Sequence, residues 1–126
     1  MNKEEYFDYH RNFCDEMITV TQAKNADYTG ETQDPFANFT RVEALGICST
    51  EQGFLTRMTD KMCRITSFVQ KGELLVKDES VQDTLHDLAN YCALFSAYIE
   101  SKKEITGREV VVYEDPHRVF ASRPTK

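Results

Sequence analysis

The chain has 126 residues, of which 40% are apolar and 29% are charged, and these proportions are typical of one globular domain. Its formal net charge of −6 argues against general nucleic-acid binding, which requires a basic surface. No apolar run approaches the roughly 20 residues of a membrane span, and the first residues lack the pattern of a signal peptide, so we expect a cytoplasmic protein with neither nucleic acid nor membrane as a partner.

Two helices are expected in the first third of the chain. Residues 3–24 carry apolar side chains at helical spacing along one broad face, which predicts a long helix with most of that face in the core. Gly30 and the polar residues after it predict an irregular loop that begins where this helix ends. The fixed φ of Pro35 suits the first turn of a short helix, which Gly46 is expected to end.

A second long helix is expected in the middle of the chain. Ser49 and Gln52 have the spacing of a capping box, so the helix should begin there, run to about Lys71 and end at Gly72. Lys61 and its neighbours form a polar line beside the apolar stripe. The residues of that stripe are Phe54, Met58, Met62, Ile65 and Val69.

The third long helix is the most strongly periodic stretch of the sequence. Residues 78–103 carry one apolar stripe, and the opposite side is polar at first and apolar further along, which predicts a helix buried on two sides. Such a helix favours a homo-oligomer, either a dimer or a tetramer. The stripe comprises Val81, Leu85, Leu88, Cys92, Phe95 and Ile99.

The last residues predict a different kind of segment. Val110–Tyr113 is the only credible strand, and a single strand is not stable alone. The expected fold class is therefore all-α. A bundle of three long helices and one short helix occupies residues 1–107 as a single domain, and residues 108–126 follow as an extended or β C-terminal arm.

Carboxylates occur in three segments that a helical bundle could bring together. Asp83 and Asp87 lie one turn apart on the third long helix, near Glu79, while Asp60 lies on the second long helix and Asp27 in the first loop. Oxygen ligands of this kind favour Mg²⁺, or Mn²⁺, over Zn²⁺, and the four cysteines show no metal-ligand spacing. The alternative is that the acids face water, because carboxylates near a helix N-terminus are also favoured by the helix dipole.

Three cationic side chains are candidates for phosphate contacts. Lys24 lies at the end of the first helix, and Lys61 and Arg64 lie near Asp60 on the second long helix. Arginine suits bidentate contact with phosphate. The alternative is a solvated flank of ion pairs, which is the commonest arrangement of such residues.

Four segments, taken in order, resemble the nucleotide modification associated domain 1 family. That family is largely phage-encoded and is similar in character to the all-α nucleoside triphosphate pyrophosphohydrolases of the MazG type. The resemblance implies a helical oligomer with a nucleotide pocket at the helix interface. The segments are Lys24–Tyr28, Asp34–Phe39, Arg57–Arg64 and Asp78–Tyr91.

The resemblance also implies roles for individual residues. Asp83 and Asp87 become candidate catalytic residues, and Tyr28 and Tyr91 become candidates for stacking on a base. Phe39 could also stack, although a core position is favoured for it. The candidate metal ligands are Asp27, Asp60, Glu79, Asp83 and Asp87, and the candidate substrate-binding residues are Lys24, Tyr28, Lys61, Arg64, Asn90 and Tyr91.

The expected function is Mg²⁺-dependent hydrolysis of a nucleoside triphosphate to monophosphate and pyrophosphate, in phage nucleotide metabolism and hence in the host cytoplasm. The alternative is a protein that binds or sequesters a nucleotide without catalysis. The MazG-type enzymes carry a Glu-x-x-Glu pair on one helix. The helix of Asp60 lacks such a pair, and its absence favours this alternative. A helical interaction module is the third possibility.

Overall fold

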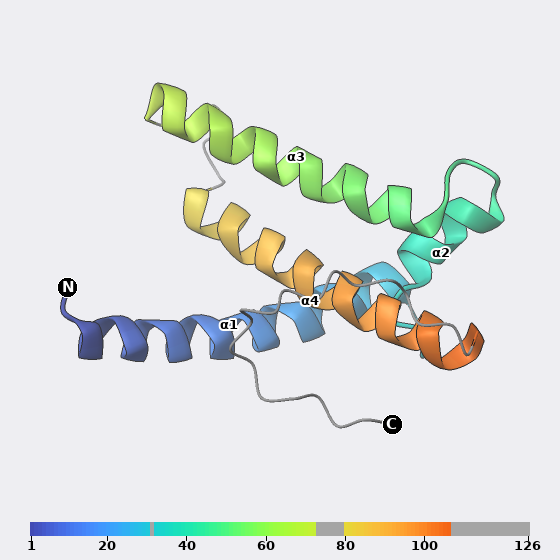
Figure 1. Ribbon diagram of the computed structural model, residues 1–126, viewed down its shortest axis with the longest axis horizontal. Coiled ribbons are helices and arrows are strands. Elements are labelled where there is room, and N and C mark those ends of the chain that lie inside the picture. The colour runs from blue at the N-terminus through green and yellow to red at the C-terminus, as the bar shows by residue number, and fades with distance from the viewer. Residues whose placement is uncertain (31, 73–79, 107–126) are drawn as a thin grey trace, which may run out of the picture.

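The computed structural model describes residues 1–30, 32–72 and 80–106, without the side chains of residues 28, 29 and 104–106. Within these ranges all regular structure is helical, which confirms three long helices and one short helix (Figure 1). The expected extended segment in residues 108–126 lies outside the described residues. The helices are α1 (Lys3–Thr29), α2 (Ala37–Ala44), α3 (Thr50–Lys71) and α4 (Val81–Thr106).

The helix boundaries follow from capping and from glycine. Ser49 and Gln52 form the expected capping box at the start of α3, and Gly72 ends that helix with a φ of 76°. The prediction that α1 ends near Lys24 is wrong, because the helix continues to Thr29 and ends only at Gly30. Residues 24–29 contain neither glycine nor proline, so nothing stops the helix earlier. Asp27 therefore lies on α1 and not in a loop.

The helix α4 lies between α3 and α1, and packs on both (Figure 1). It runs back along α3 in the opposite direction. On its other side, the ring of His86 stacks on Phe13 of α1 with centroids 4.1 Å apart. The helix thus has a neighbour on two sides, but the prediction that both sides are buried holds only in part, because Leu85 is 38% exposed and Cys92 is exposed.

The core is an aromatic cluster at the junction of α2, α3 and α4. Phe54 of α3 is 0% exposed, and its ring stacks on Phe39 of α2 at 3.9 Å and on Phe95 of α4 at 4.7 Å. Tyr98 lies beside it, with ring centroids 5.7 Å apart. Stacked aromatic pairs add stabilisation beyond the area that they bury. The cluster therefore fixes where the three helices meet.

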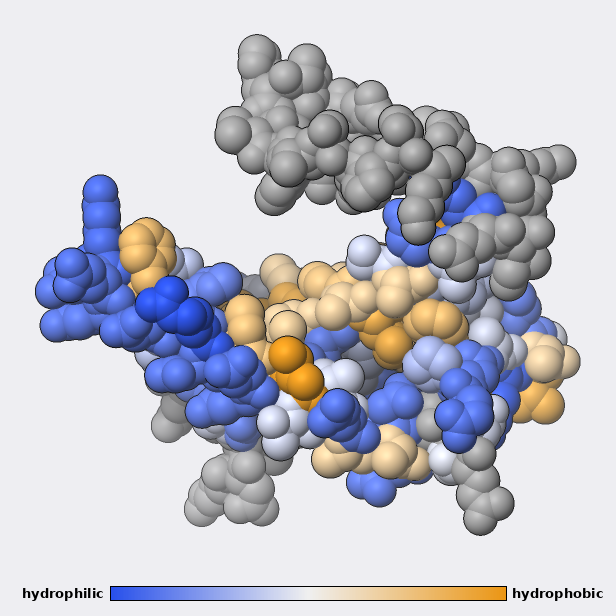
Figure 2. All heavy atoms as spheres, turned by 90° about the horizontal axis from the view of Figure 1, so that it is seen from below, coloured by the Kyte–Doolittle hydropathy of each residue, from blue (hydrophilic) through white to orange (hydrophobic). Residues whose placement is uncertain are grey.

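The apolar stripes predicted for α1 and α3 are buried only in part. Met62 and Val69 of α3 are exposed, whereas Lys61, expected on the flank, is buried. Tyr6 and Phe7 near the start of α1 are about half exposed. On the face drawn in Figure 2, hydrophilic residues predominate over that end of α1, and apolar residues gather toward the middle. In the described part of the chain, no helix combines the length and apolar character that a membrane span needs.

Candidate functional site

A cavity of about 80 Å³ lies where the four helices meet. Each helix contributes polar or aromatic side chains to it. Asn25 also donates a hydrogen bond of 2.8 Å to the backbone carbonyl of Pro35, which holds α1 against the segment that leads into α2. The lining residues are Thr21, Lys24, Asn25, Asn38, Phe39, Arg57, Lys61, Asp87, Asn90, Tyr91 and Leu94.

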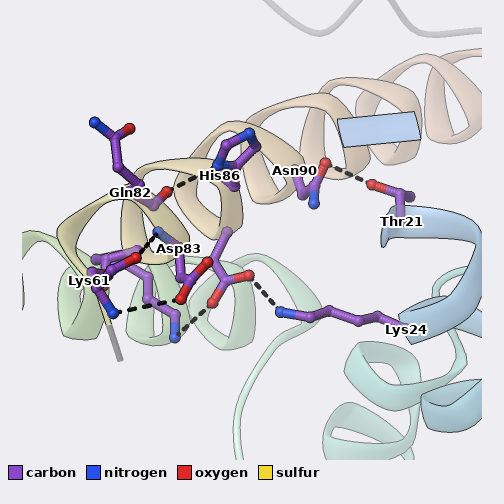
Figure 3. Close-up of polar contacts among 10 residues, drawn as sticks. Thr21, Lys24, Lys61, Gln82, Asp83, His86 and Asn90 are labelled. Carbon is purple, nitrogen blue, oxygen red and sulfur yellow. Dashed lines mark hydrogen bonds and ion pairs between the residues drawn. The ribbon is translucent and has the colours of Figure 1, made fainter. Parts of the chain in front are cut away.

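One carboxylate at this cavity joins three helices. Lys24 of α1 donates to Oδ1 of Asp87 over 2.5 Å, and Nζ of Lys61 on α3 lies 3.2 Å from Oδ2 of the same residue. Lys24 extends toward the site from α1, and Lys61 extends toward it from α3 (Figure 3). The side chain of Lys61 is only 10% exposed, and a buried ammonium requires a partner of opposite charge. Asp87 supplies that partner.

The charge state of Asp87 depends on two opposing effects. Burial is the largest single effect and raises the pKa of the Asp87 carboxyl, but the hydrogen bonds and the positive charges of Lys24 and Lys61 together outweigh it. The pKa of Asp87 therefore lies below its ordinary value of 3.8. The group is a carboxylate at neutral pH, and it is a weak base.

This lowered pKa predicts acid sensitivity that depends on Asp87. The stabilisation from the carboxylate is fully present above pH 3.8 and is lost as the pH falls through the lower pKa of the folded protein. At pH 7, Asp87→Asn should lower the free energy of unfolding by about 1–3 kcal/mol. In urea denaturation, this difference should shrink as the pH falls below 3.8 and through the lower pKa of the folded protein. A difference that does not change with pH would contradict the assignment.

The exposed carboxylate Asp60 provides the matched control. It pairs with Arg64 one turn further along α3, and its side chain is half exposed. Exposed pairs at this spacing contribute only about 0.3–0.5 kcal/mol. Asp60→Asn should therefore change the free energy of unfolding far less than Asp87→Asn at pH 7.

Next to the charged cluster, Asn90 presents a buried amide. Its Oδ1 accepts a hydrogen bond from the hydroxyl of Thr21 on α1 (Figure 3). Its Nδ2 is buried and has no hydrogen-bond partner among the described residues. Tyr91 follows it, with its ring edge-on to Phe39 and the centroids 6.1 Å apart. A buried donor without a partner is costly, so a ligand that carries an acceptor atom would be favoured here.

The family model described as nucleotide modification associated domain 1 matches residues 36–99, just over half of the chain. The chain belongs to this family. The matched range contains Lys61, Asp87 and Asn90, whereas Lys24 lies before it on α1. No match was found among curated proteins or among solved structures.

Five of the predicted site residues line the cavity. Two further cavity residues were not predicted, although helical spacing could have indicated them. Thr21 lies one turn before Lys24, and Arg57 lies one turn before Lys61. Asn25 and Asn38 gave no comparable signal. The predicted residues that line the cavity are Lys24, Lys61, Asp87, Asn90 and Tyr91.

The other predicted site residues whose side chains the structure describes are not among the cavity residues. Asp27 and Asp60 are exposed, and Arg64 pairs with Asp60 at 3.5 Å. Asp83 is exposed and caps its own helix, because its carboxylate accepts from the backbone N–H of Ser80. Glu79 and the side chain of Tyr28 lie outside the described residues.

The sequence predicted a Mg²⁺ or Mn²⁺ ion at this site, which would need ligands among the residues that line the cavity. Such ions prefer several oxygen ligands. Asp87 is the one carboxylate among the described lining residues, and each of its oxygens already contacts a lysine. Among the side chains that the structure describes, no group of three histidine, cysteine, aspartate or glutamate residues is arranged to hold a metal ion. The described residues therefore do not fit a site for either ion.

Proposed function

We propose that the chain binds a nucleotide in the cavity between its four helices, with the phosphate at Lys24 and Lys61. The observation that carries the proposal is the convergence of two lysines from separate helices on one cavity carboxylate. An ammonium group has three N–H donors, so a lysine that holds Asp87 can also donate to a phosphate oxygen. The family description, which refers to nucleotide modification, supports this choice of ligand.

The local charge supports an anionic ligand although the chain as a whole is acidic. Arg57 also lines the cavity, and its guanidinium suits bidentate contact with phosphate. Because Lys61 and Asp87 are largely buried, their interactions are screened less than those of surface charges. A phosphate should therefore be attracted to this cavity even at physiological salt concentration.

The neighbouring polar and aromatic groups support a nucleotide over inorganic phosphate. Nδ2 of Asn90 is a donor for a carbonyl oxygen or a ring nitrogen of a base, and Asn38 offers a second amide. The rings of Tyr91 and Phe39 supply apolar surface beside them. Sites for small molecules typically combine such apolar walls with a few placed polar groups.

Isothermal titration calorimetry of the full chain tests the proposal. Each common deoxynucleotide is titrated as monophosphate and as triphosphate, in EDTA and in Mg²⁺. At least one should bind with one site per chain and more tightly than inorganic phosphate. If none binds in either buffer to a protein that is folded by circular dichroism, the cavity is not a nucleotide site.

Magnesium-dependent hydrolysis of a nucleoside triphosphate is the second candidate function. The ionised carboxylate of Asp87 at a cationic cavity favours it, because such a group could hold a water or a proton during the reaction. The low basicity of Asp87 favours binding without catalysis. Release of pyrophosphate from a triphosphate in Mg²⁺ measures this activity directly.

Asp87→Asn separates the two functions. If the cavity only binds, removing the negative charge should leave the metal-free affinity for nucleotide unchanged or raise it by up to about tenfold, which is 1.4 kcal/mol. If Asp87 takes part in hydrolysis, the same variant should lose turnover by about 10²–10⁴-fold. Calorimetry in EDTA and a pyrophosphate assay in Mg²⁺ give the two readouts, and Asp60→Asn is the control for each.

A further inference from the structure

Two of the amide side chains that line the cavity differ in how freely they can turn. Asn38 lies on α2 and Asn90 on α4, and the rings of Phe39 and Tyr91 line the same cavity. Within the described part of the chain, the Asn38 side chain has no hydrogen bond, whereas Asn90 is bonded to Thr21. This difference determines which groups on a ligand each amide can accept.

The orientation of the Asn90 amide is fixed by Thr21 of α1. The hydroxyl of Thr21 donates to Oδ1 of Asn90, and Nδ2 is turned away from it (Figure 3). The Thr21 side chain makes no other hydrogen bond to a described residue. If the amide were turned round, the hydroxyl hydrogen and Oδ1 would both lack a partner, instead of Nδ2 alone. The observed orientation is therefore favoured, and Asn90 offers the cavity a donor and no acceptor.

We infer that the cavity selects nucleotides whose base presents a carbonyl oxygen, rather than an amino group, to Asn90. This inference rests on the proposed function and names the class of base. Nδ2 of Asn90 is buried without a partner among the described residues, so an acceptor beside it removes the cost of an unpaired donor. An amino group in the same place is a second donor, which leaves both groups unpaired. Guanine, thymine, uracil and hypoxanthine carry such a carbonyl, whereas cytosine and adenine carry the amino group.

The sugar of a bound nucleotide limits which edge of the base can reach Asn90. It joins the base to the phosphate, which the proposed function puts at Lys24 and Lys61. The edge away from the sugar is therefore the one that faces the amide, and it carries the carbonyl or amino group at C4 of a pyrimidine or C6 of a purine. The rings of Phe39 and Tyr91 can contact the face of any base, so they do not distinguish the two classes.

Asn38 provides the matched control, because its amide is not held in one orientation by a described residue. It can turn its oxygen toward an amino group or its nitrogen toward a carbonyl. We therefore expect Asn38 to strengthen the binding of both classes of base to the same degree. It contributes affinity at the same cavity without selectivity.

Calorimetry with matched pairs of deoxynucleotides tests the inference. The deoxynucleotide of uracil is compared with that of cytosine, and that of hypoxanthine with that of adenine. The members of a pair differ only at the carbonyl or amino group and the neighbouring ring nitrogen, and they carry the same number of phosphates. In each pair that binds, the carbonyl member should bind tighter by about tenfold or more.

Three variants assign the preference, and each is judged by the ratio of the two affinities within a pair. Asn90→Asp keeps an oxygen toward Thr21 and puts an acceptor in place of Nδ2, so the preference should reverse. Thr21→Val removes the hydroxyl that fixes the amide, so the ratio should move toward one. Asn38→Ala should lower both affinities by the same factor and keep the ratio. A partial loss of folding lowers both affinities alike, so a changed ratio reports selectivity and not stability.

The outcomes that overturn the inference differ from those that overturn the proposed function. Equal affinities within the pairs, or tighter binding of the amino members, overturn the inference and leave nucleotide binding intact. Loss of the preference in Asn38→Ala also overturns it. If no member of either pair binds to the folded wild-type chain, both fail. If Asn90→Asp does not fold, Thr21→Val decides, and an unchanged ratio in that variant counts against the fixed amide.

Discussion

Replacing Phe54 with alanine is expected to lower the free energy of unfolding by about 3–5 kcal/mol. The side chain is fully buried and stacks on rings from two other helices, Phe39 and Phe95. Its removal leaves a cavity that α2, α3 and α4 all border, so no single helix can move to fill it. Urea denaturation followed by circular dichroism measures the loss.

Leu55 provides the control for Phe54. It is the next residue of α3 and is 62% exposed. Exposed side chains usually contribute within about 0.5 kcal/mol, so Leu55→Ala should be close to wild type. Domains of this size are stable by only about 5–15 kcal/mol. If Phe54→Ala does not fold, Phe54→Leu replaces it and should show a smaller loss in the free energy of unfolding. Equal losses for Phe54→Ala and Leu55→Ala would contradict the aromatic core.

Replacing Lys61 with methionine is expected to weaken nucleotide binding by about 10–100-fold. A hydrogen bond to a charged group contributes about 1.5–3 kcal/mol, which corresponds to a change of this size. Methionine keeps an unbranched apolar stem and removes the ammonium group that contacts Asp87. Asp87 keeps its partner Lys24, so the carboxylate is not left alone in the cavity. Calorimetry with the tightest-binding monophosphate measures the change.

Lys102 is the matched control for Lys61. Like Lys61, it forms an ion pair between two long helices, because its Nζ on α4 lies 2.9 Å from Oε1 of Glu51 on α3. It is exposed and does not line the cavity. Lys102→Met should therefore leave the affinity unchanged. If Lys61→Met is folded and binds the nucleotide as tightly as the wild type, Lys61 does not contribute to nucleotide binding.

The sequence predicted the helices well because their signals are local. Ser49 with Gln52, and the glycines at 30, 46 and 72, act on the residues next to them. The end of α1 lies later than predicted, because the residues from Lys24 to Thr29 include no helix breaker and the helix ends only at Gly30. The prediction of a homo-oligomer stays a prediction, and sedimentation velocity would test it.

The candidate site was predictable only in part, because its geometry depends on how helices pack. Lys61 and Asp60 are adjacent in sequence, and periodicity alone did not indicate that Lys61 faces α4 while Asp60 faces solvent. The same holds for Asp83 and Asp87, which lie one turn apart on α4. Asp83 caps the helix, and Asp87 reaches the lysines. The aromatic core that α2, α3 and α4 share constrains the rotation of these helices about their axes, and no single helix encodes it.

Nuclear magnetic resonance tests the central claim most directly. In a ¹⁵N-labelled chain, titration with a nucleoside monophosphate should shift the side-chain amide of Asn90 and the backbone amides around Lys61 and Asp87. Those groups border the cavity on α3 and α4. A nucleotide that binds while these resonances stay in place, with shifts confined to the exposed surface around Asp60 and Asp83, would contradict the account.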